Sequence, residues 1–402
     1  MRVLVLDEEI PYPTDTGKKT RTFNLISRLA KRHEIDYVCY VDPAELDVIK
    51  KFQKFGVNVY PVIQQKSKNN LKRFYLKLFL NMFSNLPFII YQYYTQAYQA
   101  KVNSLMQTKL YDLIHCEISL YSIFLSNKKV QVPSVGICHN VEAEIWKRYF
   151  LNETNIFKKI FILSQWKRIS AFEAQYLQKF TTCIAVSDRD ANYLRKNYGV
   201  YNVEIVPNGV DIDYFHPTSI RFKKYNIVFT GSMDWRPNQD AIKFFLKNIW
   251  HLVLKEVPSA TFTVVGRNPP QWLYKLANRY KGVELTGTVN DVRPYINRAH
   301  LFVVPLRIGG GSRLKILEAM ASGKAVISTV IGAEGLEVKH GENIFLEDSP
   351  YGFAKRIIQL FKNDIIRKKL EKKGRELVEK NYNWEILANK MDKIWRKVAC
   401  GM

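Results

Sequence analysis

LFVVPLRIGGGSRLKILEAMASG, residues 301–323, is the stretch from which the fold can be predicted. It begins with an apolar run, Leu301 to Leu306, of the kind that forms a buried strand, and continues through three glycines. A helical pattern follows and ends at Gly323, after which a second apolar run, Ala325 to Ile327, begins. This order predicts a strand, a glycine loop, a helix and another strand.

The glycine loop and the first turn of the predicted helix have the character of an anion site. Backbone N–H groups there lie at the positive end of the helix dipole, which attracts negative charge. Arg313 and Lys315 oppose that dipole, so a bound polyanion explains them better than helix stability does. Glu318 can accept two hydroxyl hydrogen bonds of the kind that a ribose offers. Phosphate and ribose contacts together indicate a nucleotide, bound by Gly309, Gly310, Gly311, Ser312, Arg313, Leu314, Lys315 and Glu318.

Both halves of the chain alternate short apolar runs with longer helical patterns, which predicts an α/β fold with parallel sheets. The first-half runs are 3–6, 35–40, 57–62, 113–116, 134–138, 182–186 and 203–206. The second-half runs are 227–230, 261–265, 283–285, 301–305, 325–328 and 343–346. The halves meet at a linker-like stretch, 215–219. We therefore predict domains over 1–216 and 217–380, with residues 381–402 forming a helix that returns to the first domain.

Glycines follow most of the second-half runs, namely Gly231, Gly266, Gly287, Gly309 and Gly332. Ligands of open parallel sheets bind outside the carboxyl ends of the strands, where glycine lets the backbone approach closely. Tight turns alone would also explain any single one of these glycines. Taken together with Arg313 and Glu318, the set favours a binding site.

Composition narrows the class of protein. The 402 residues carry a net charge of +24, which implies an anionic partner, and are 47% hydrophobic, which suits well-packed cores. The five scattered cysteines have no metal-ligand spacing, so we expect a reducing, cytoplasmic compartment and no metal. The first seven residues predict a strand rather than a signal peptide, and no apolar run is long enough to span a membrane.

Three motifs occur in a characteristic order: VPNGVD at 206–211, Gly231 at the start of the second half, and LEAMASG at 317–323. With this order and spacing, the chain resembles the GT-B glycosyltransferases of family 4 from residue 11 to Trp384. The resemblance implies two Rossmann-like domains facing a cleft, with the acceptor on the first and the nucleotide on the second. It also implies sugar transfer from a UDP- or GDP-sugar with retention of configuration and without a metal ion or other cofactor.

The resemblance assigns roles to single residues. Glu318 matches the second carboxylate of the family's Glu-x7-Glu motif, which holds the ribose, whereas Gly310 stands in place of the first. Ser232 and Asn238 stand where the family often has basic residues that neutralise the diphosphate. We therefore expect Arg313 and Lys315 to take over that role, with Arg236 and Arg267 as reserve candidates.

In the first half, His139 matches the family's cleft histidine, which touches the donor sugar, and is predicted to be catalytic together with Glu318 and Arg313. A core or capping histidine is the structural alternative. Gly17 matches one glycine of the loop beneath the donor phosphates, and Lys18 occupies the place of the other. Lys18 or Arg21 could meet a phosphate or an anionic acceptor, and a solvated basic loop is the alternative.

Two segments, 66–91 and 145–162, mix basic residues with bulky apolar ones. Such helices can lie on an anionic membrane surface, and the family's acceptors are glycans or lipid-linked molecules. Peripheral association with the inner face of the cell membrane is therefore predicted, the alternative being ordinary amphipathic helices with solvated lysines.

Three other functions are alternatives to this prediction. A nucleic-acid partner is not predicted, because no nucleic-acid-binding motif appears and the positive charge is spread through both halves. A GT-B sugar-nucleotide epimerase shares the fold, but the motif at 206–211 and the Glu318 helix fit a transferase better. A non-catalytic scaffold remains an alternative because the first motif carboxylate is absent.

Overall fold

The computed structural model describes residues 1–64, 71–118, 123–125, 132–308 and 313–401. The chain forms two compact units: unit 1 is Met1–Pro207 with Leu387–Met402, and unit 2 is Asn208–Ile386. The chain thus leaves unit 1 after Pro207 and re-enters it at Leu387, whereas the sequence placed these boundaries after residues 216 and 380.

Unit 1 is built on a sheet of seven parallel strands in the order β3-β2-β1-β4-β5-β6-β7. The strands are β1 (Arg2–Leu6), β2 (Glu34–Val41), β3 (Val57–Ile63), β4 (Leu113–Cys116), β5 (Ser134–Cys138), β6 (Thr182–Ala185) and β7 (Val203–Ile205). Its helices are α1 (Gly17–Leu29), α2 (Leu46–Gln53), α3 (Leu71–Met82), α4 (Phe88–Tyr93), α5 (Gln96–Thr108), α6 (Glu142–Asn152), α7 (Ile156–Tyr176) and α8 (Asp188–Tyr198).

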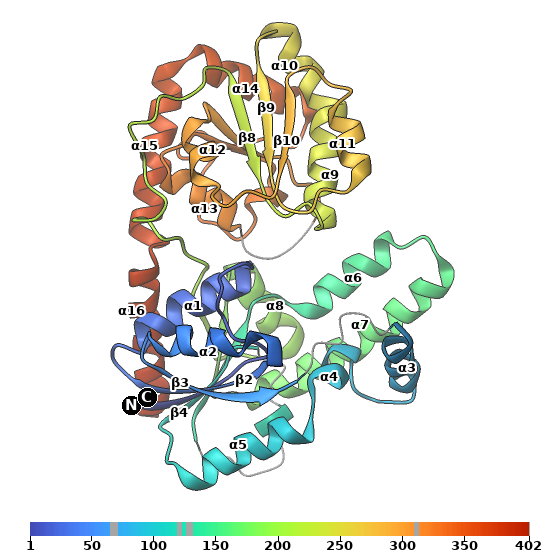
Figure 1. Ribbon diagram of the computed structural model, residues 1–402, viewed down its shortest axis with the longest axis vertical. Helices are drawn as coiled ribbons and strands as arrows, with labels where there is room; N and C mark the ends of the chain where they lie inside the picture. Colours follow the sequence, from blue (N-terminus) through green and yellow to red (C-terminus); the bar gives the residue numbers. More distant parts are fainter. Residues whose placement is uncertain (65–70, 119–122, 126–131, 309–312, 402) are drawn as a thin grey trace. The chain divides into compact units, whose positions relative to one another are not determined.

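Unit 2 is built on six parallel strands in the order β10-β9-β8-β11-β12-β13. These are β8 (Asn226–Thr230), β9 (Thr261–Val265), β10 (Val283–Gly287), β11 (Leu301–Val304), β12 (Val326–Ser328) and β13 (Phe345–Leu346). The helices are α9 (Arg236–Phe244), α10 (Trp250–Glu256), α11 (Gln271–Ala277), α12 (Arg293–Arg298), α13 (Leu314–Ala321), α14 (Pro350–Lys362) and α15 (Asp364–Asn381), and α16 (Trp384–Ala399) follows them. Figure 1 shows helices flanking both sheets.

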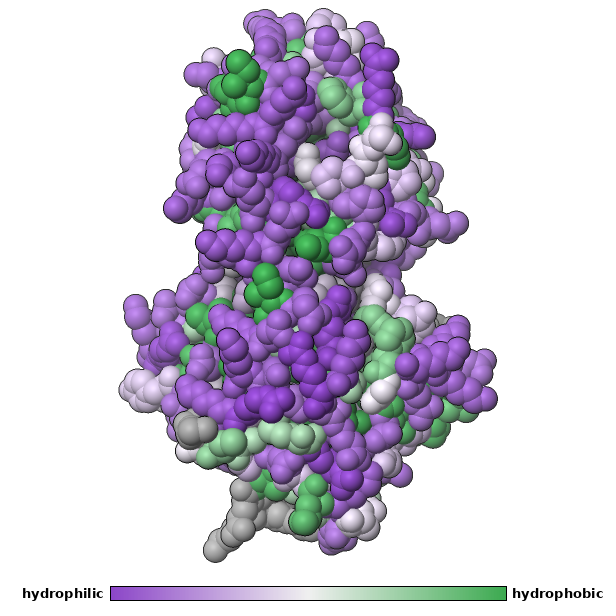
Figure 2. All heavy atoms as spheres, turned by 90° about the vertical axis from the view of Figure 1, so that its left-hand side faces the viewer, coloured by the Kyte–Doolittle hydropathy of each residue, from purple (hydrophilic) through white to green (hydrophobic). Residues whose placement is uncertain are grey.

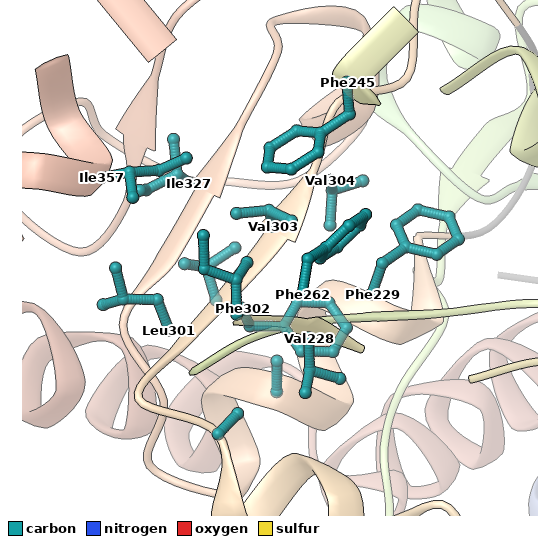
Figure 3. Packing of buried hydrophobic residues seen from close by; sticks show 14 of the residues in the cluster. Val228, Phe229, Phe245, Phe262, Leu301, Phe302, Val303, Val304, Ile327 and Ile357 are labelled. Carbon is teal, nitrogen blue, oxygen red and sulfur yellow. The ribbon is translucent and has the colours of Figure 1, made fainter. Parts of the chain in front are cut away.

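Each of the thirteen apolar runs predicted from the sequence contains a strand, and all the strand pairs are parallel, so the predicted α/β class is confirmed. The runs are mostly apolar because helices cover both faces of a parallel sheet. In unit 2, strands β8, β9 and β11 supply buried residues such as Phe229, Phe262 and Phe302. Figure 3 shows these rings packed with Phe245 and Val303 in one core.

The C-terminal helix α16 packs on unit 1, as predicted. Its Trp395 is fully buried and donates an indole N–H to Nδ1 of His115 at 3.2 Å. One turn away, Asp392 lies 2.7 Å from Nε2 of His33. One buried and one partly buried side-chain contact fix the register of the helix on unit 1.

Four of the five cysteines are buried thiols and Cys400 is exposed, with no disulfide among them. Figure 2 shows a largely hydrophilic face with scattered apolar residues, as the high charge content leads one to expect. Among the described residues, no helix combines the length and the apolar character needed to cross a membrane.

Candidate active site

Strand order in the sheet of unit 2 reverses between β8 and β11. β9 and β10 extend to one side of this point, and β12 and β13 to the other. Ligands of open α/β sheets bind at such a switch point, outside the carboxyl ends of the strands. Gly231 follows β8 and Arg313 lies on the segment after β11, so the predicted nucleotide residues gather here. Gly309, Gly310, Gly311 and Ser312, which belong to the same prediction, lie outside the described residues.

A chain of hydrogen bonds connects the helix after β11 with the loop after β8. Nζ of Lys315 donates to Oδ1 of Asn238 at 2.8 Å, and Nδ2 of Asn238 donates to the carbonyl of Ser232 at 2.7 Å. Nε of Arg267 donates to the hydroxyl of Ser232 at 2.9 Å. The structure therefore brings together Gly231, Lys315 and Arg267, three residues that the sequence assigned to one site. Asn238, which the sequence marked only as a missing basic residue, is the side chain that connects them.

Lys315 is a cation held among neutral partners. Its ammonium lies 4.1 Å from the centre of the Phe229 ring, and no carboxylate of the described residues is within ion-pairing distance. Burial and the neighbouring charge of Arg313 lower the pKa of Lys315 to about 7, although Glu318 opposes that shift. Shielding a cation without an anionic partner is unfavourable. An anion that entered the site would restore the lysine's charge.

Glu318, one turn further along α13, is half-buried, and its carboxylate makes no hydrogen bond or ion pair with any described residue. Burial raises the pKa of its carboxyl to about 7, against the attraction of Lys315. No described residue donates a hydrogen bond to this carboxylate. The prediction that it accepts hydrogen bonds from the hydroxyl groups of a ligand is therefore compatible with its surroundings.

Arg313 directly precedes α13, and its side chain is buried 3.6 Å from a carboxylate oxygen of Glu334. It supplies no side-chain cap to the helix, so the N–H groups of the first turn, which begins at Leu314, are not capped by it. Backbone donors, Arg313 and Lys315 together make this helix end positive. An anion at this point would be stabilised by all three.

The chain packs so closely at the ends of β8, β9 and β10 that the glycines there leave no room for a side chain. Gly231 has φ +155°, and a Cβ there would lie 2.6 Å from Nζ of Lys315. A Cβ on Gly266 would lie 1.8 Å from the carbonyl oxygen of Gly231. Gly287, at the end of β10, has φ +72° and its added Cβ would come within 3.0 Å of the Tyr274 hydroxyl. The glycines at these strand ends are required by close packing and by positive φ.

The predicted catalytic residue of unit 1, His139, follows β5 directly. Its Nε2 lies 3.4 Å from Oε1 of Glu117, which follows β4. Glu117 is buried, with His115 Nε2 at 2.7 Å and the hydroxyl of Thr22 on its other oxygen. Glu117 was not predicted from the sequence. Its signal was a carboxylate placed directly after an apolar run, at the switch point between β1 and β4.

The prediction that Lys18 or Arg21 meets a phosphate is not supported by their contacts. Lys18 forms an ion pair with the buried Asp7 and a second one, at 3.4 Å, with Glu8. The guanidinium of Arg21 is buried and donates to the carbonyls of Val206, at 2.8 Å, and Pro207, at 2.6 Å. Both cations are committed to the fold of unit 1. Gly17 opens α1, and its predicted contact with a phosphate stays a prediction.

Carboxylates near His139 have separate roles. Glu173 of α7 accepts hydrogen bonds from the backbone N–H groups of Glu142, at 2.9 Å, and Ala143, at 3.1 Å, and so replaces a side-chain cap for α6. Burial raises the pKa of Glu142 to about 7. Glu144 pairs with Arg189 at 2.9 Å on the surface.

The described residues contain no group of three or more potential ligands arranged for a metal ion.

Comparison with known proteins agrees with this architecture. A family model described as Glycosyltransferase Family 4 matches residues 16–214, and one described as Glycosyl transferases group 1 matches residues 224–363. An uncharacterised 44.6 kDa protein of the cps region of Klebsiella pneumoniae is 22% identical over 400 residues, covering 95% of this chain and 96% of that protein. Phosphatidyl-myo-inositol mannosyltransferase of Mycobacterium tuberculosis is 26% identical over 236 residues, covering 55% of this chain and 61% of that protein.

Solved structures match over the whole length. Sucrose-phosphate synthase from Thermosynechococcus elongatus superposes with a TM-score of 0.73 at 17% identity and 100% coverage of both chains. HepE of Anabaena, solved in complex with UDP-glucose, gives a TM-score of 0.65 at 14% identity, covering 99% of this chain and 100% of that one. Two units with parallel sheets and two matching family models, one on each half, show that this chain is a GT-B glycosyltransferase of family 4.

Proposed function

We propose that this enzyme transfers a sugar from a nucleotide-sugar, either a UDP- or a GDP-sugar, to a hydroxyl group of a glycan or lipid-linked acceptor. The observation that carries the donor half is Lys315, a shielded cation with neutral partners at the switch point of unit 2. Glu318, unsatisfied on the same helix, supports a ribose contact. The complex of HepE with UDP-glucose, a protein of similar fold, is in line with such a donor.

The chemistry follows from the charges in the site. The departing nucleotide diphosphate gains negative charge as the glycosidic bond breaks, and Lys315, Arg313 and the N-terminus of α13 would stabilise it. We propose that the acceptor hydroxyl attacks from the face that the phosphate leaves, so that configuration is retained. A leaving phosphate oxygen then accepts the acceptor's proton. Fixed protein cations would do the work that a metal ion does elsewhere.

A thermal-shift panel of UDP-, GDP- and ADP-sugars tests the donor proposal. A ligand at 100 times its Kd stabilises the folded state by about 2.7 kcal/mol, which one base should produce and the others should not. Replacing Glu318 with alanine should weaken the same nucleotide about 10- to 100-fold, because hydrogen bonds to a charged group contribute about 1.5–3 kcal/mol. Titration calorimetry measures this loss. Unchanged affinity in Glu318→Ala would exclude the proposed ribose contact.

The acceptor requirement separates the proposed transferase from its rivals. A transferase should release the nucleoside diphosphate from the identified donor quickly only when an acceptor is added. An epimerase would convert the donor without an acceptor, and a scaffold would do neither.

We also propose that unit 1 associates with an anionic membrane surface through α3 and the hairpin formed by α6 and α7. Arg168 of α7 donates to the carbonyls of Asn81, at 2.7 Å, and Met82, at 3.0 Å, which sets the end of α3 beside α7. Large apolar side chains are exposed on both parts, among them Leu76, Phe79, Leu80, Met82, Phe83, Leu151, Ile156, Phe157 and Ile160. We call these nine residues the apolar surface of unit 1.

Part of the predicted membrane segments has another role. Phe150 packs on Trp166 with ring centres 5.8 Å apart, and Lys159 lies 5.1 Å above the Phe150 ring. Those aromatic residues hold α6 against α7, as the alternative of ordinary helices predicts. Residues 66–70 lie outside the described residues. The proposal therefore rests on the exposed residues of the apolar surface and on the lysines around them.

Replacing Phe83 and Phe157 with serine should reduce vesicle binding by more than tenfold. The two side chains are 77% and 80% exposed, and burying each phenylalanine in lipid contributes about 1.5–3 kcal/mol. Cosedimentation with vesicles containing anionic lipid measures the effect. Leu110→Ser is the control, because Leu110 is 91% exposed in the same unit but lies outside the apolar surface. Equal losses in the control and the double variant would contradict the proposal.

A further inference from the structure

A buried row of polar side chains runs through unit 1 from α16 to the end of β5. Trp395 of α16 donates its indole N–H to Nδ1 of His115 at 3.2 Å, and Nε2 of His115 lies 2.7 Å from Oε2 of Glu117. Oε1 of Glu117 accepts the hydroxyl hydrogen of Thr22 and lies 3.4 Å from Nε2 of His139. The row therefore ends at the residue predicted to be catalytic.

The indole of Trp395 determines where the proton of His115 resides. An indole nitrogen is only a hydrogen-bond donor, so Nδ1 of His115 must be the acceptor and carries no proton. The proton of a neutral His115 is then on Nε2, where it is donated to Glu117. A doubly protonated His115 would place two N–H groups against each other. His115 is thus held as a neutral donor to Glu117.

Glu117 is charged in this environment. Its two oxygens face the N–H of His115, the hydroxyl of Thr22 and Nε2 of His139, and its contacts with the two histidines hold its pKa well below the usual value against the effect of burial. The nearby guanidinium of Arg21 adds a favourable field. An ionised carboxylate only accepts hydrogen bonds. Every group that faces it must therefore offer a hydrogen.

The same argument applies to His139. Its Nε2 is shielded from solvent and lies at ion-pairing distance from Glu117. If Nε2 lacked a proton, its lone pair would face a negatively charged oxygen, which is unfavourable. A neutral ring that carries its proton on Nε2 has its lone pair on Nδ1. Nδ1 makes no hydrogen bond with the described residues.

We propose that Glu117 is a positioning residue, which orients the ring of His139 and holds its proton on Nε2, so that Nδ1 is the atom presented to the substrate. Trp395 contributes from α16, because its indole N–H keeps the proton of His115 on Nε2. His115 therefore stays a neutral donor to Glu117. The C-terminal helix thereby controls the state of a residue at the opposite end of the row. This inference rests on the proposed function only in taking His139 as a residue that meets the substrate.

Nitrogen NMR of the full chain with labelled histidine tests the inference without a substrate. In the native protein, Nε2 of His139 should carry a directly bonded hydrogen and Nδ1 should not, with signals identified by their loss in His139→Gln. In Glu117→Gln the amide cannot accept from His115, Thr22 and His139 together, so the His139 signals should move toward a mixture of the two tautomers. Unmoved His139 signals in Glu117→Gln would overturn the inference.

A second variant guards against loss of folding. Trp395→Phe keeps a ring in the core but removes the indole donor. The His115 signals should therefore change, and the His139 signals should change as a consequence. The matched control is Asp392→Asn, which disturbs another contact of α16, with His33, and leaves the row intact. A His139 shift as large in Asp392→Asn as in Trp395→Phe would mean that docking of α16, and not the row, is responsible.

Nucleotide binding separates this inference from the proposed function. Apart from Gly17, the predicted nucleotide residues are in unit 2, so the thermal shift produced by UDP should be unchanged in Glu117→Gln. If UDP does not bind the native protein, the proposed donor is wrong while the tautomer result still decides the role of Glu117. If an active donor is identified, Glu117→Gln should lower kcat about 10- to 100-fold. Losses of that size follow when the group that orients a metal-binding histidine is removed, and Glu117 orients His139 in the same way.

Discussion

Replacing Lys315 with methionine should lower the affinity for UDP or GDP by about 100-fold. The ammonium is a charged end of the hydrogen-bond chain that runs from Lys315 through Asn238 to Ser232, and losing a charge-assisted contact with a diphosphate removes about 1.5–3 kcal/mol. Methionine has a similar length, and its sulfur can replace the ammonium over the Phe229 ring, so the fold should persist. Titration calorimetry with each nucleotide measures the change.

The pH dependence of binding provides a second signature of Lys315. In the unliganded enzyme Lys315 loses its charge near pH 7, because burial lowers its pKa to about 7. A bound diphosphate needs that charge. Affinity should therefore decrease as the pH rises from 7 to 9, and Lys315→Met should lack this decrease. Glu318 titrates in the same range, so the measurement is best made in Glu318→Gln.

Lys324 provides the matched control for this prediction. It is also a partly buried lysine of unit 2 with a lowered pKa, and its Nζ donates to the carbonyls of Asn297, at 2.7 Å, and Ala299, at 3.1 Å. Those carbonyls precede β11, at the amino ends of the strands, whereas the proposed site lies at their carboxyl ends. Lys324→Met should leave nucleotide affinity unchanged. An equal loss in both variants would indicate a general effect of removing buried charge and contradict the proposed site.

Most of the fold could be predicted from local sequence, because apolar runs indicate buried strands and glycines indicate their ends. The segments around Phe229, Phe262 and Phe302 could be identified as strands since both faces of a parallel sheet are covered. The glycines at the ends of β8, β9 and β10 were informative for the same reason, because close packing excludes a side chain there.

Long-range partners explain what the sequence could not reveal. From the sequence, Lys18 or Arg21 could meet an anionic ligand or belong to a solvated basic loop, but their partners are Asp7 and the carbonyls of residues 206 and 207, which the fold brings to them. Likewise, Glu117 and Trp395 lie far apart in the chain, and only the docking of α16 reveals that both act on His115. A charged residue's neighbours in sequence do not determine its partner in space.

Replacing Gly266 with alanine should destabilise unit 2 by about 3 kcal/mol, the upper part of the usual range for an overpacked core. The added Cβ would lie 1.8 Å from the carbonyl oxygen of Gly231, which is backbone and cannot move aside as a side chain does. Neighbouring hydrogen bonds oppose relief, since Gly231 donates to Val265 and Met233 donates to Arg267. Thermal unfolding should show a midpoint lower by about 6–12 °C.

Gly374→Ala is the control that separates crowding from the general cost of changing a glycine. A Cβ at Gly374, inside α15, would meet Cγ of Met320 at 3.2 Å, and that flexible side chain can move. Alanine also favours a helix over glycine by about 1 kcal/mol, so this variant should be nearly neutral. Gly266→Ala should in addition weaken UDP binding at temperatures where unit 2 remains folded, because the displaced carbonyl belongs to the loop that contacts Lys315 through Asn238. Normal UDP affinity in a destabilised Gly266→Ala protein would instead separate that loop from the nucleotide site.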